Sequence, residues 1–565
     1  MSSTRWIILR WVLTGVGLTL APLAHTGECI REHPYTADAL AILDFQKENP
    51  ASGVHERQFV LSNIHLTRQD VFPIDQHWLA RQANRFHIVT REEVILASLP
   101  FGAGDSVSRR DLAEAERILR DKPYFYDARV LIREICGDKI DVDVVVRDVW
   151  TLTPRIGFSR SGGDNRIDLG VSDINLFGLG KDLEVSYVEN ADRTGVRFRY
   201  TDENIVGSRW KGDVIVSDND DGHRYGVEIA RPFYALDTAW ATGFAADTFK
   251  RKKGLYFEND KLWELDAESE YYDMSVGRMW RRTDRFVDRL WMGMAYERES
   301  FDYPIGFPGP TSTLRRFVYP YVAWQRLPDR FIKTTNVDRI NRTEDIALGV
   351  RTLFKLGWSP EALSNQGDQL LGDAFISGNW YLSEYQLLNA RLSFAGRFAV
   401  DDGHAEDVFL TAQTTYHWDH HERWGLIARV SYSYAHNLSD DQQLLIGGDS
   451  GLRGYPSRYQ SGDRRFLVTF EERYYADIFP LRLFRLGFAA FVDIGRAWYE
   501  DDPPTWVPPR DGDHFGVLAN IGLGLRIESV RTRRDRVIHI DIAKPLVDGP
   551  GVGSTELTIT VKRAI

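Results

Sequence analysis

Apolar and polar residues alternate along most of this chain. Clear alternation runs through 196–201, 537–542 and 557–561, and this period predicts half-buried β-strands. Sequences rich in glycine and aspartate, such as 177–181 and 218–222, separate the alternating stretches as turns. From residue 153 to 565, the pattern predicts roughly sixteen antiparallel strands, an even number that suits a closed barrel.

Residues 58–150 carry a different pattern, in which helical and strand periods alternate. A strand pattern at 58–66 precedes two helices, the first opened by a capping-box sequence at Thr90 and the second capped by Ser108. Alternating stretches at 128–135 and 139–147 follow. This order predicts a small α+β domain before the barrel, with an additional helix or loop in the long link 67–89.

The first 24 residues have the layout of a secretory signal peptide. Arg5 and Arg10 precede a short apolar stretch, and small residues lead to Ala24 as a candidate cleavage position. That stretch is too short for a stable membrane span, and no later run of apolar residues is long enough to predict a transmembrane helix. Export is therefore expected, with residues 25–57 as an N-terminal periplasmic segment containing one short helix over 37–46.

Composition excludes several classes of protein. The net charge of −11 argues against nucleic acid as a partner, because phosphate binding needs a basic face. The two cysteines, Cys29 and Cys136, allow neither a disulfide framework nor a cysteine metal cluster. A single disulfide between them is possible in an oxidising periplasm, but Cys29 is expected in a flexible tail, which makes this disulfide a disfavoured alternative.

Aromatic residues make up 12% of the chain, which fits an aromatic-rich soluble β-protein or a membrane barrel with aromatic girdles. The predicted strands have one apolar and one polar face, which favours the membrane barrel. A soluble β-propeller is the main alternative, but no repeated blade motif is found.

Strand parity places two carboxylates inside the predicted barrel. In the strand over 486–498 the even positions are apolar and would face lipid, whereas Phe491, Asp493 and Gly495 would face the lumen. In the strand over 466–475, Glu471 and Arg473 point inward by the same parity. Both carboxylates therefore lie on strands that are expected to be neighbours.

A glycine-rich loop offers a cationic partner for these carboxylates. The loop presents Arg453, Gly454 and Tyr455, and a guanidinium can bind a carboxylate through two parallel hydrogen bonds. The further loop glycines are Gly447, Gly448 and Gly451. Together with Gly454 they allow the backbone to fold inward, and Tyr455 could pack against the lumen wall. The alternative is a solvated loop arginine and an aspartate that lines a channel.

Enzymatic chemistry is not expected. No nucleophile motif occurs in a strand–turn–helix context. A metal site at the densest histidine cluster, 417–421, would need further ligands, and the sequence does not place any beside it. No catalytic residue, cofactor or metal ion is therefore predicted.

Two motifs together closely resemble the BamA/TamA superfamily of outer-membrane assembly and translocation proteins. They are Leu-Arg-Gly-Tyr at 452–455, after a Gly-Gly pair, and Phe-x-Asp-x-Gly at 491–495. The resemblance implies that the loop arginine lies in the lumen against acidic strand residues, here Arg453 against Asp493 and Glu471. The short sequence motifs at 177–181, 231–233 and 541–546 support this resemblance.

The segment 58–150 resembles a POTRA domain through Gly104-Asp105 before its second helix and Lys122-Pro123-Tyr124-Phe125 after it. The resemblance implies a transmembrane barrel over 153–565 in the bacterial outer membrane, with the POTRA domain in the periplasm. Two features depart from the family pattern. The chain ends in Arg563-Ala564-Ile565 rather than an aromatic residue, and there is room for one POTRA domain only.

The function expected from the resemblance is that of an outer-membrane protein assembly factor. It would capture an unfolded client polypeptide through the POTRA domain and insert or translocate it through the barrel. The two strands that close the barrel are expected over 153–163 and 555–564. Serine and glycine residues within 159–163 favour weak pairing of the first closing strand, and the alternative is that these residues form a turn. The alternatives are a two-partner secretion-type transporter and a passive porin-like barrel. Expected partners are the lipid bilayer, client polypeptides and periplasmic assembly or translocation proteins.

Overall fold

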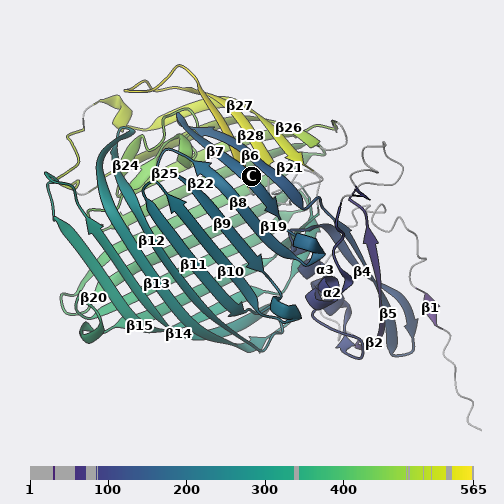
Figure 1. Cartoon of the computed structure of the whole chain (residues 1–565). Helices are drawn as coiled ribbons and strands as arrows, with labels where there is room; N and C mark the ends of the chain where they lie inside the picture. Colours follow the sequence, from purple (N-terminus) through teal and green to yellow (C-terminus); the bar gives the residue numbers. More distant parts are fainter. Residues whose placement is uncertain are drawn as a thin grey trace, which may run out of the picture.

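The computed structural model of this chain consists of a closed β-barrel with a small α+β module at one end (Figure 1). The structure describes residues 29–31, 57–71, 84–85, 87–335, 337, 343–478, 480, 484–500, 502–510, 512–529 and 537–562. The predicted signal peptide, the helix over 37–46, most of the link 67–89 and the C-terminal residues 563–565 lie outside these ranges. No helix among the described residues is both long and apolar enough to cross a membrane.

Twenty antiparallel strands form the barrel, so the prediction of a closed antiparallel barrel is confirmed and the predicted number of sixteen strands is wrong. In chain order they are β6 (Leu152–Ser161), β7 (Asp164–Asp173), β8 (Lys181–Glu189), β9 (Thr194–Asp202), β10 (Lys211–Asn219), β11 (Gly222–Arg231), β12 (Trp240–Phe257), β13 (Asp260–Arg282), β14 (Phe286–Asp302), β15 (Ser312–Pro328), β18 (Gly349–Ser359), β19 (Gln369–Ser383), β20 (Gln386–Ala399), β21 (His404–His421), β22 (Trp424–His436), β25 (Arg464–Tyr475), β26 (Phe484–Trp498), β27 (Leu518–Ser529), β28 (Val537–Pro545) and β29 (Glu556–Lys562). The prediction assumed a uniform strand spacing, but β6 to β11 have only 9 or 10 residues each, and the connections between them are shorter than the strands.

The two faces of the barrel wall differ in polarity, as the alternation along each strand requires. In β9, Val196 and Phe198 are exposed on the outside, whereas Arg197 and Arg199 line a cavity of about 550 Å³ on the inside. Other exposed apolar side chains on the outer face include Met274 of β13 and Leu523 of β27. In these strands, the side chains of the outer face are therefore apolar, and the arginines of the inner face are charged.

The barrel closes where β29 meets β6, and this seam has little backbone pairing. Among the described residues, Ile559 and Arg160 are its one pair in register, whereas β6 pairs with β7 over its whole length. The Glu556 side chain adds a hydrogen bond from the Gly163 backbone N–H at 2.9 Å. Gly162 and Gly163 lie in the turn between β6 and β7 and not within the strand. Because the other neighbouring strands share longer ladders, this seam is the easiest place for the barrel to open.

The module consists of β1 (Ile30–Arg31), β2 (Phe59–Gln69), α2 (Glu92–Ser98), β3 (Ser106–Val107), α3 (Arg109–Asp121), β4 (Phe125–Cys136) and β5 (Lys139–Asp148). Its sheet has the order β1-β4-β5-β2-β3, and an apolar core that includes Leu112 and Leu119 joins α3 to that sheet. Ser108 caps α3 as predicted, and its reciprocal hydrogen bonds with Asp111 form a capping box that was not predicted. The cap predicted at Thr90 is wrong, since the Thr90 hydroxyl donates to Asp148 at 3.0 Å and α2 begins without a side-chain cap.

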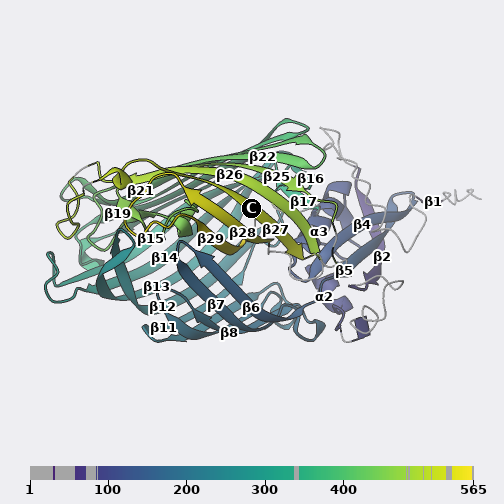
Figure 2. The ribbon, with the colours of Figure 1, turned by 90° about the horizontal axis from the view of Figure 1, so that it is seen from above.

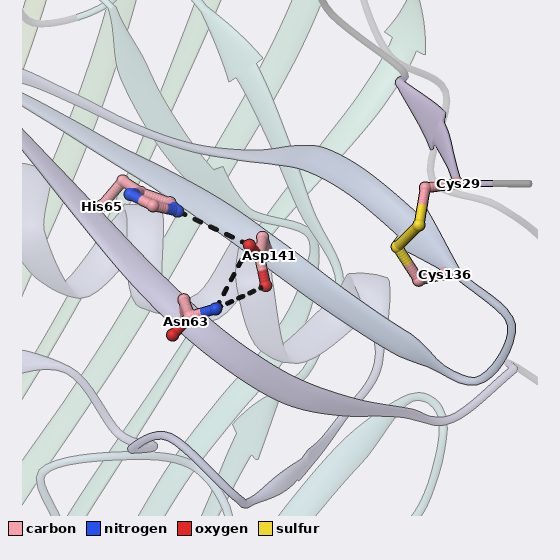
Figure 3. Close-up of a disulfide and its surroundings, with 5 residues drawn as sticks. All are labelled: Cys29, Asn63, His65, Cys136 and Asp141. Atoms are coloured by element: carbon pink, nitrogen blue, oxygen red, sulfur yellow. Dashed lines mark hydrogen bonds and ion pairs between the residues drawn. A yellow bond between two sulfur atoms is a disulfide. The ribbon is translucent and has the colours of Figure 1, made fainter.

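A disulfide joins Cys29 to Cys136, so the expectation that these cysteines would not pair is wrong (Figure 3). Ile30 and Arg31 pair as β1 with Ile135 and Glu134 of β4, and this register brings Cys29 opposite Cys136. The bridge spans 107 residues of sequence. In the chain-entropy model, a cross-link over a loop of that length stabilises the folded state by about 4–5 kcal/mol.

Candidate functional site

The connection between β22 and β25 folds back into the barrel and forms a packed insert. It contains β23 (Leu444–Ile446), the short helix η4 (Gly448–Ser450) and β24 (Gln460–Gly462), and β23 pairs with β24. Leu452, Tyr455 and Tyr459 of the connection are buried together with Ala497 and Leu518 of the barrel wall. This connection, 437–463, is called the lumenal loop below.

Arg453 anchors the lumenal loop to three strands of the wall. Its Nε and Nη2 atoms each lie 2.9 Å from an oxygen of Asp493 on β26, which gives a bidentate ion pair. Its Nη1 atom donates to Glu471 of β25 at 2.8 Å and to Asp541 of β28 at 3.3 Å. Asp493 is fully buried. The structure thus brings together Arg453, Asp493 and Glu471, the three charged residues that the sequence pairs.

Two further residues of this network were not singled out from the sequence. Asp541 accepts hydrogen bonds from both Arg453 and Arg526, the second at 2.5 Å. Arg526 also donates to Glu471 at 3.0 Å, and Arg473 donates to the same carboxylate at 2.8 Å. Three arginines therefore face three carboxylates, so that the buried charges balance, as burial of ions requires.

Neutral groups complete the surroundings of Arg453. The Asn520 side chain donates to Asp493 at 2.9 Å and accepts from the Gly454 backbone N–H at 3.1 Å. The Phe491 ring lies 3.3 Å from the Arg453 guanidinium carbon, so this aromatic residue of the strand motif makes a cation–π contact. Gly495, the last residue of that motif, lies beside Ile446 of the loop.

Two loop glycines allow the backbone to approach its neighbours closely. A Cβ atom at Gly454 would lie 2.6 Å from the Asn520 side chain, and one at Gly448 would lie 2.6 Å from the Gly162 backbone. The other two loop glycines named in the sequence analysis, Gly447 and Gly451, flank η4. Larger residues at 448 and 454 would push the loop away from the wall.

The same loop also contacts the first hairpin of the barrel, on the other side of the seam. The Ser457 backbone N–H donates to the Gly162 carbonyl and its hydroxyl donates to the Ser161 carbonyl, both at 2.8 Å. Tyr455 reaches the opposite side, where its hydroxyl donates to the Ala519 carbonyl at 2.9 Å. The lumenal loop therefore bridges the β6–β7 turn and the strands β25 to β28 from inside the barrel.

The module docks against one end of the barrel, and α3 makes one set of the contacts (Figure 2). The barrel's Arg209 makes another, donating to the Ala97 and Leu99 carbonyls of the module. One receiving element is the antiparallel pair of β16 (Phe331–Thr334) and β17 (Glu344–Ala347). Arg120 of α3 donates to both oxygens of Asp345 at 2.7 and 2.8 Å, and Lys333 lies 2.7 Å from Glu116. Because these ion pairs are largely buried, they hold the module in one position against the barrel.

Acidification should undock the module only well below neutral pH. Burial raises the pKa of Glu116, but Arg120, Lys333 and Arg129 outweigh it and lower the pKa from 4.5 to about 2. Because the folded-state pKa is depressed, the stabilisation is complete above pH 4.5 and is lost as pH falls towards 2. Spin labels on α3 and β16 should report a constant distance from pH 7 to 5 and separation towards pH 2.

Glu116→Gln imitates the protonated carboxyl and serves as the control for this experiment. Docking in this variant should be weaker at pH 7 and should depend less on pH. A Glu116→Gln variant that docks like the wild type throughout would show that other groups control the acid response.

The described residues offer little support for a metal centre. The ring nitrogen Nε2 of His420, in the histidine cluster, lies at hydrogen-bond distance from Glu472, 2.8 Å away. One group of described residues has the spacing of metal ligands, namely Cys29, Glu134 and Cys136. Its two sulfur atoms are joined in the disulfide.

No protein-family model and no curated protein matches this chain. Several solved structures are similar to it. CdiB from Acinetobacter baumannii matches with a TM-score of 0.44 and 13% identity, over 89% of this chain and 74% of that one. BamA from Haemophilus ducreyi, in a structure that lacks POTRA domains 1-3, matches with a TM-score of 0.38 and 12% identity, over 90% of this chain and 85% of that one. CdiB from Escherichia coli matches with a TM-score of 0.37 and 11% identity, over 92% of each chain.

The residues of the two motifs are in contact in this chain, and the barrel encloses them. A closed antiparallel barrel that holds a Leu-Arg-Gly-Tyr loop against a lumenal aspartate is the arrangement that a resemblance to the BamA/TamA superfamily implies.

Proposed function

We propose that this chain is an outer-membrane barrel that inserts or translocates client polypeptides, and that its module is a periplasmic POTRA domain that captures them. The observation that carries the proposal is the weakly paired seam, bridged from inside by a loop that buried ion pairs hold in place. A passive pore needs neither a weak seam nor a docked module.

The outer surface supports a place in a membrane. Exposed apolar side chains such as Phe198, Met274 and Leu523 face outward, while the charged network of Arg453 faces inward. Lipid offers no hydrogen bonds to a free strand edge, so a membrane favours a closed barrel with this polarity. Barrels of this kind occur in bacterial outer membranes.

The seam suggests how a client would be handled. If β6 and β29 separate, each presents unpaired N–H and C=O groups along an edge. An extended client segment can add to such an edge through main-chain hydrogen bonds, without a fixed sequence. The lumenal loop would hold the two sides in register while the seam is closed and while it recloses. No enzymatic step is part of this function.

Reconstitution of the full chain in lipid vesicles distinguishes an insertase from a secretion transporter. An insertase should accelerate the folding of an unfolded barrel client several-fold, measured by its shift in mobility on gels. A two-partner secretion-type transporter should instead move an exported passenger into the vesicles, where added protease cannot reach it. Passage of small solutes alone, with neither effect, would favour the porin-like alternative and contradict the proposal.

A further inference from the structure

Strand β4 pairs with β5 along one edge, and its other edge faces away from β5, β2 and β3 of the module sheet. Other residues of this chain already occupy much of that second edge. At one end, β1 pairs Ile30 with Ile135 and Arg31 with Glu134. Next to these pairs, the disulfide ties Cys29 to Cys136, the last residue of β4 (Figure 3). The strand β1 is therefore fixed covalently beside the edge.

Side chains of α3 occupy the other end of the same edge. The Val130 backbone N–H donates to Glu116 at 3.0 Å, and the Ala128 carbonyl accepts from Arg120 at 3.0 Å. These are groups that an added strand would use. The stretch between the two sets of contacts is 131–133, shorter than the usual strand of about five or six residues. An additional strand cannot pair along β4 unless one set of contacts leaves.

The disulfide is what can hold β1 in place. A strand of two residues forms too few hydrogen bonds to stay paired by itself. A covalent tether makes its pairing intramolecular and so keeps its local concentration high. Without the tether, β1 should exchange readily with a competing strand.

We propose that the edge of β4 binds an extended polypeptide, that β1 occupies this site in the oxidised chain, and that reduction of the Cys29–Cys136 disulfide opens it. The identity of the natural ligand as a client polypeptide rests on the proposed function. Cys29 is exposed and the turn after Cys136 is also exposed, so a reductant can reach the bridge.

The reductant is a dithiol. One of its thiolates attacks a sulfur of the bridge and releases the other cysteine as a thiolate, which takes up a proton. The second thiol of the reductant then resolves the mixed disulfide. Two electrons and two protons pass to Cys29 and Cys136, and the dithiol becomes a disulfide.

The test uses the full chain in detergent micelles and a fluorescent peptide with the sequence of residues 26–33 in which Cys29 is replaced by serine. The peptide should bind weakly to the oxidised chain, and at least several-fold more tightly after dithiothreitol or in Cys29→Ser/Cys136→Ser. Amide exchange at residues 134 and 135 should accelerate on reduction and slow again when the peptide binds.

Asp141→Asn is the matched control. It weakens the contacts of Asp141 with Asn63 and His65 between β2 and β5 and leaves β1 and the disulfide in place (Figure 3). This variant should bind the peptide as weakly as the oxidised wild type.

Equal peptide binding by the oxidised and reduced chains would contradict the proposal. Loss of exchange protection throughout β5 on reduction would also contradict it, because the bridge would then hold the whole module and not the edge. The reduced native chain provides the test if the double variant does not fold. Since the peptide comes from this chain, its binding is independent of whether the barrel handles clients.

Discussion

Arg453→Ala should abolish client handling and leave a closed barrel of reduced stability. The substitution removes the bidentate partner of Asp493, which then keeps only uncharged donors such as Asn520 and Thr469. Leaving a buried charge unpaired costs about 3–5 kcal/mol. The lumenal loop should leave the wall, and its contacts with the β6–β7 turn should be lost with it. Vesicle reconstitution measures the activity, and mobility on unheated gels measures barrel closure.

Two variants show that the effect belongs to this ion pair. Arg298 lies in a more exposed pair, 2.9 Å from Glu270, so Arg298→Ala should cost only about 0–1 kcal/mol and leave activity unchanged. Arg453→Lys keeps the charge but loses the planar fork, and its activity should fall between wild type and Arg453→Ala.

A charge swap tests direct contact. Arg453→Asp combined with Asp493→Arg should restore part of the activity that either change removes alone. Full activity in Arg453→Ala would show that the loop anchor is not needed for client handling.

The candidate site could be predicted from the sequence because strand parity is a local property. Parity and the loop motif together bring Arg453 to Asp493 and Glu471, and the structure has all three in contact. The same parity in the predicted strand over 537–542 points Asp541 inward, so this carboxylate could have been found from the sequence. Its partner Arg526 needed knowledge of which strands are neighbours.

Other features depend on long-range contacts that no local pattern records. The disulfide forms because two residues of β1 pair with β4, and two residues carry no period. Arg120 and Asp345 are 225 positions apart, and their contact exists only when the module docks. The number of strands was missed because alternation does not show where a long stretch ends and a short hairpin begins.

Locking the seam should stop client handling completely. Arg160 and Ile559 lie opposite each other across β6 and β29, at a separation that a disulfide can span in an antiparallel pair. Arg160→Cys/Ile559→Cys, made in the Cys29→Ser/Cys136→Ser background, would therefore tie the barrel shut. A client that needs an open edge could not add to it, whereas the barrel itself should become more stable.

A second pair of cysteines controls for the cross-link itself. The hydroxyl groups of Thr153 and Ser172 lie 3.2 Å apart on β6 and β7, which are already paired along their length. Thr153→Cys/Ser172→Cys, made in the same Cys29→Ser/Cys136→Ser background, should therefore retain activity when oxidised.

The most direct measurement is client folding or translocation by the Arg160→Cys/Ile559→Cys chain, in the same vesicles before and after a reductant. Opening of the barrel at the seam predicts no activity in the oxidised chain, full recovery on reduction, and no such change in the Thr153→Cys/Ser172→Cys control. Undiminished activity with the β6–β29 disulfide fully formed would contradict it.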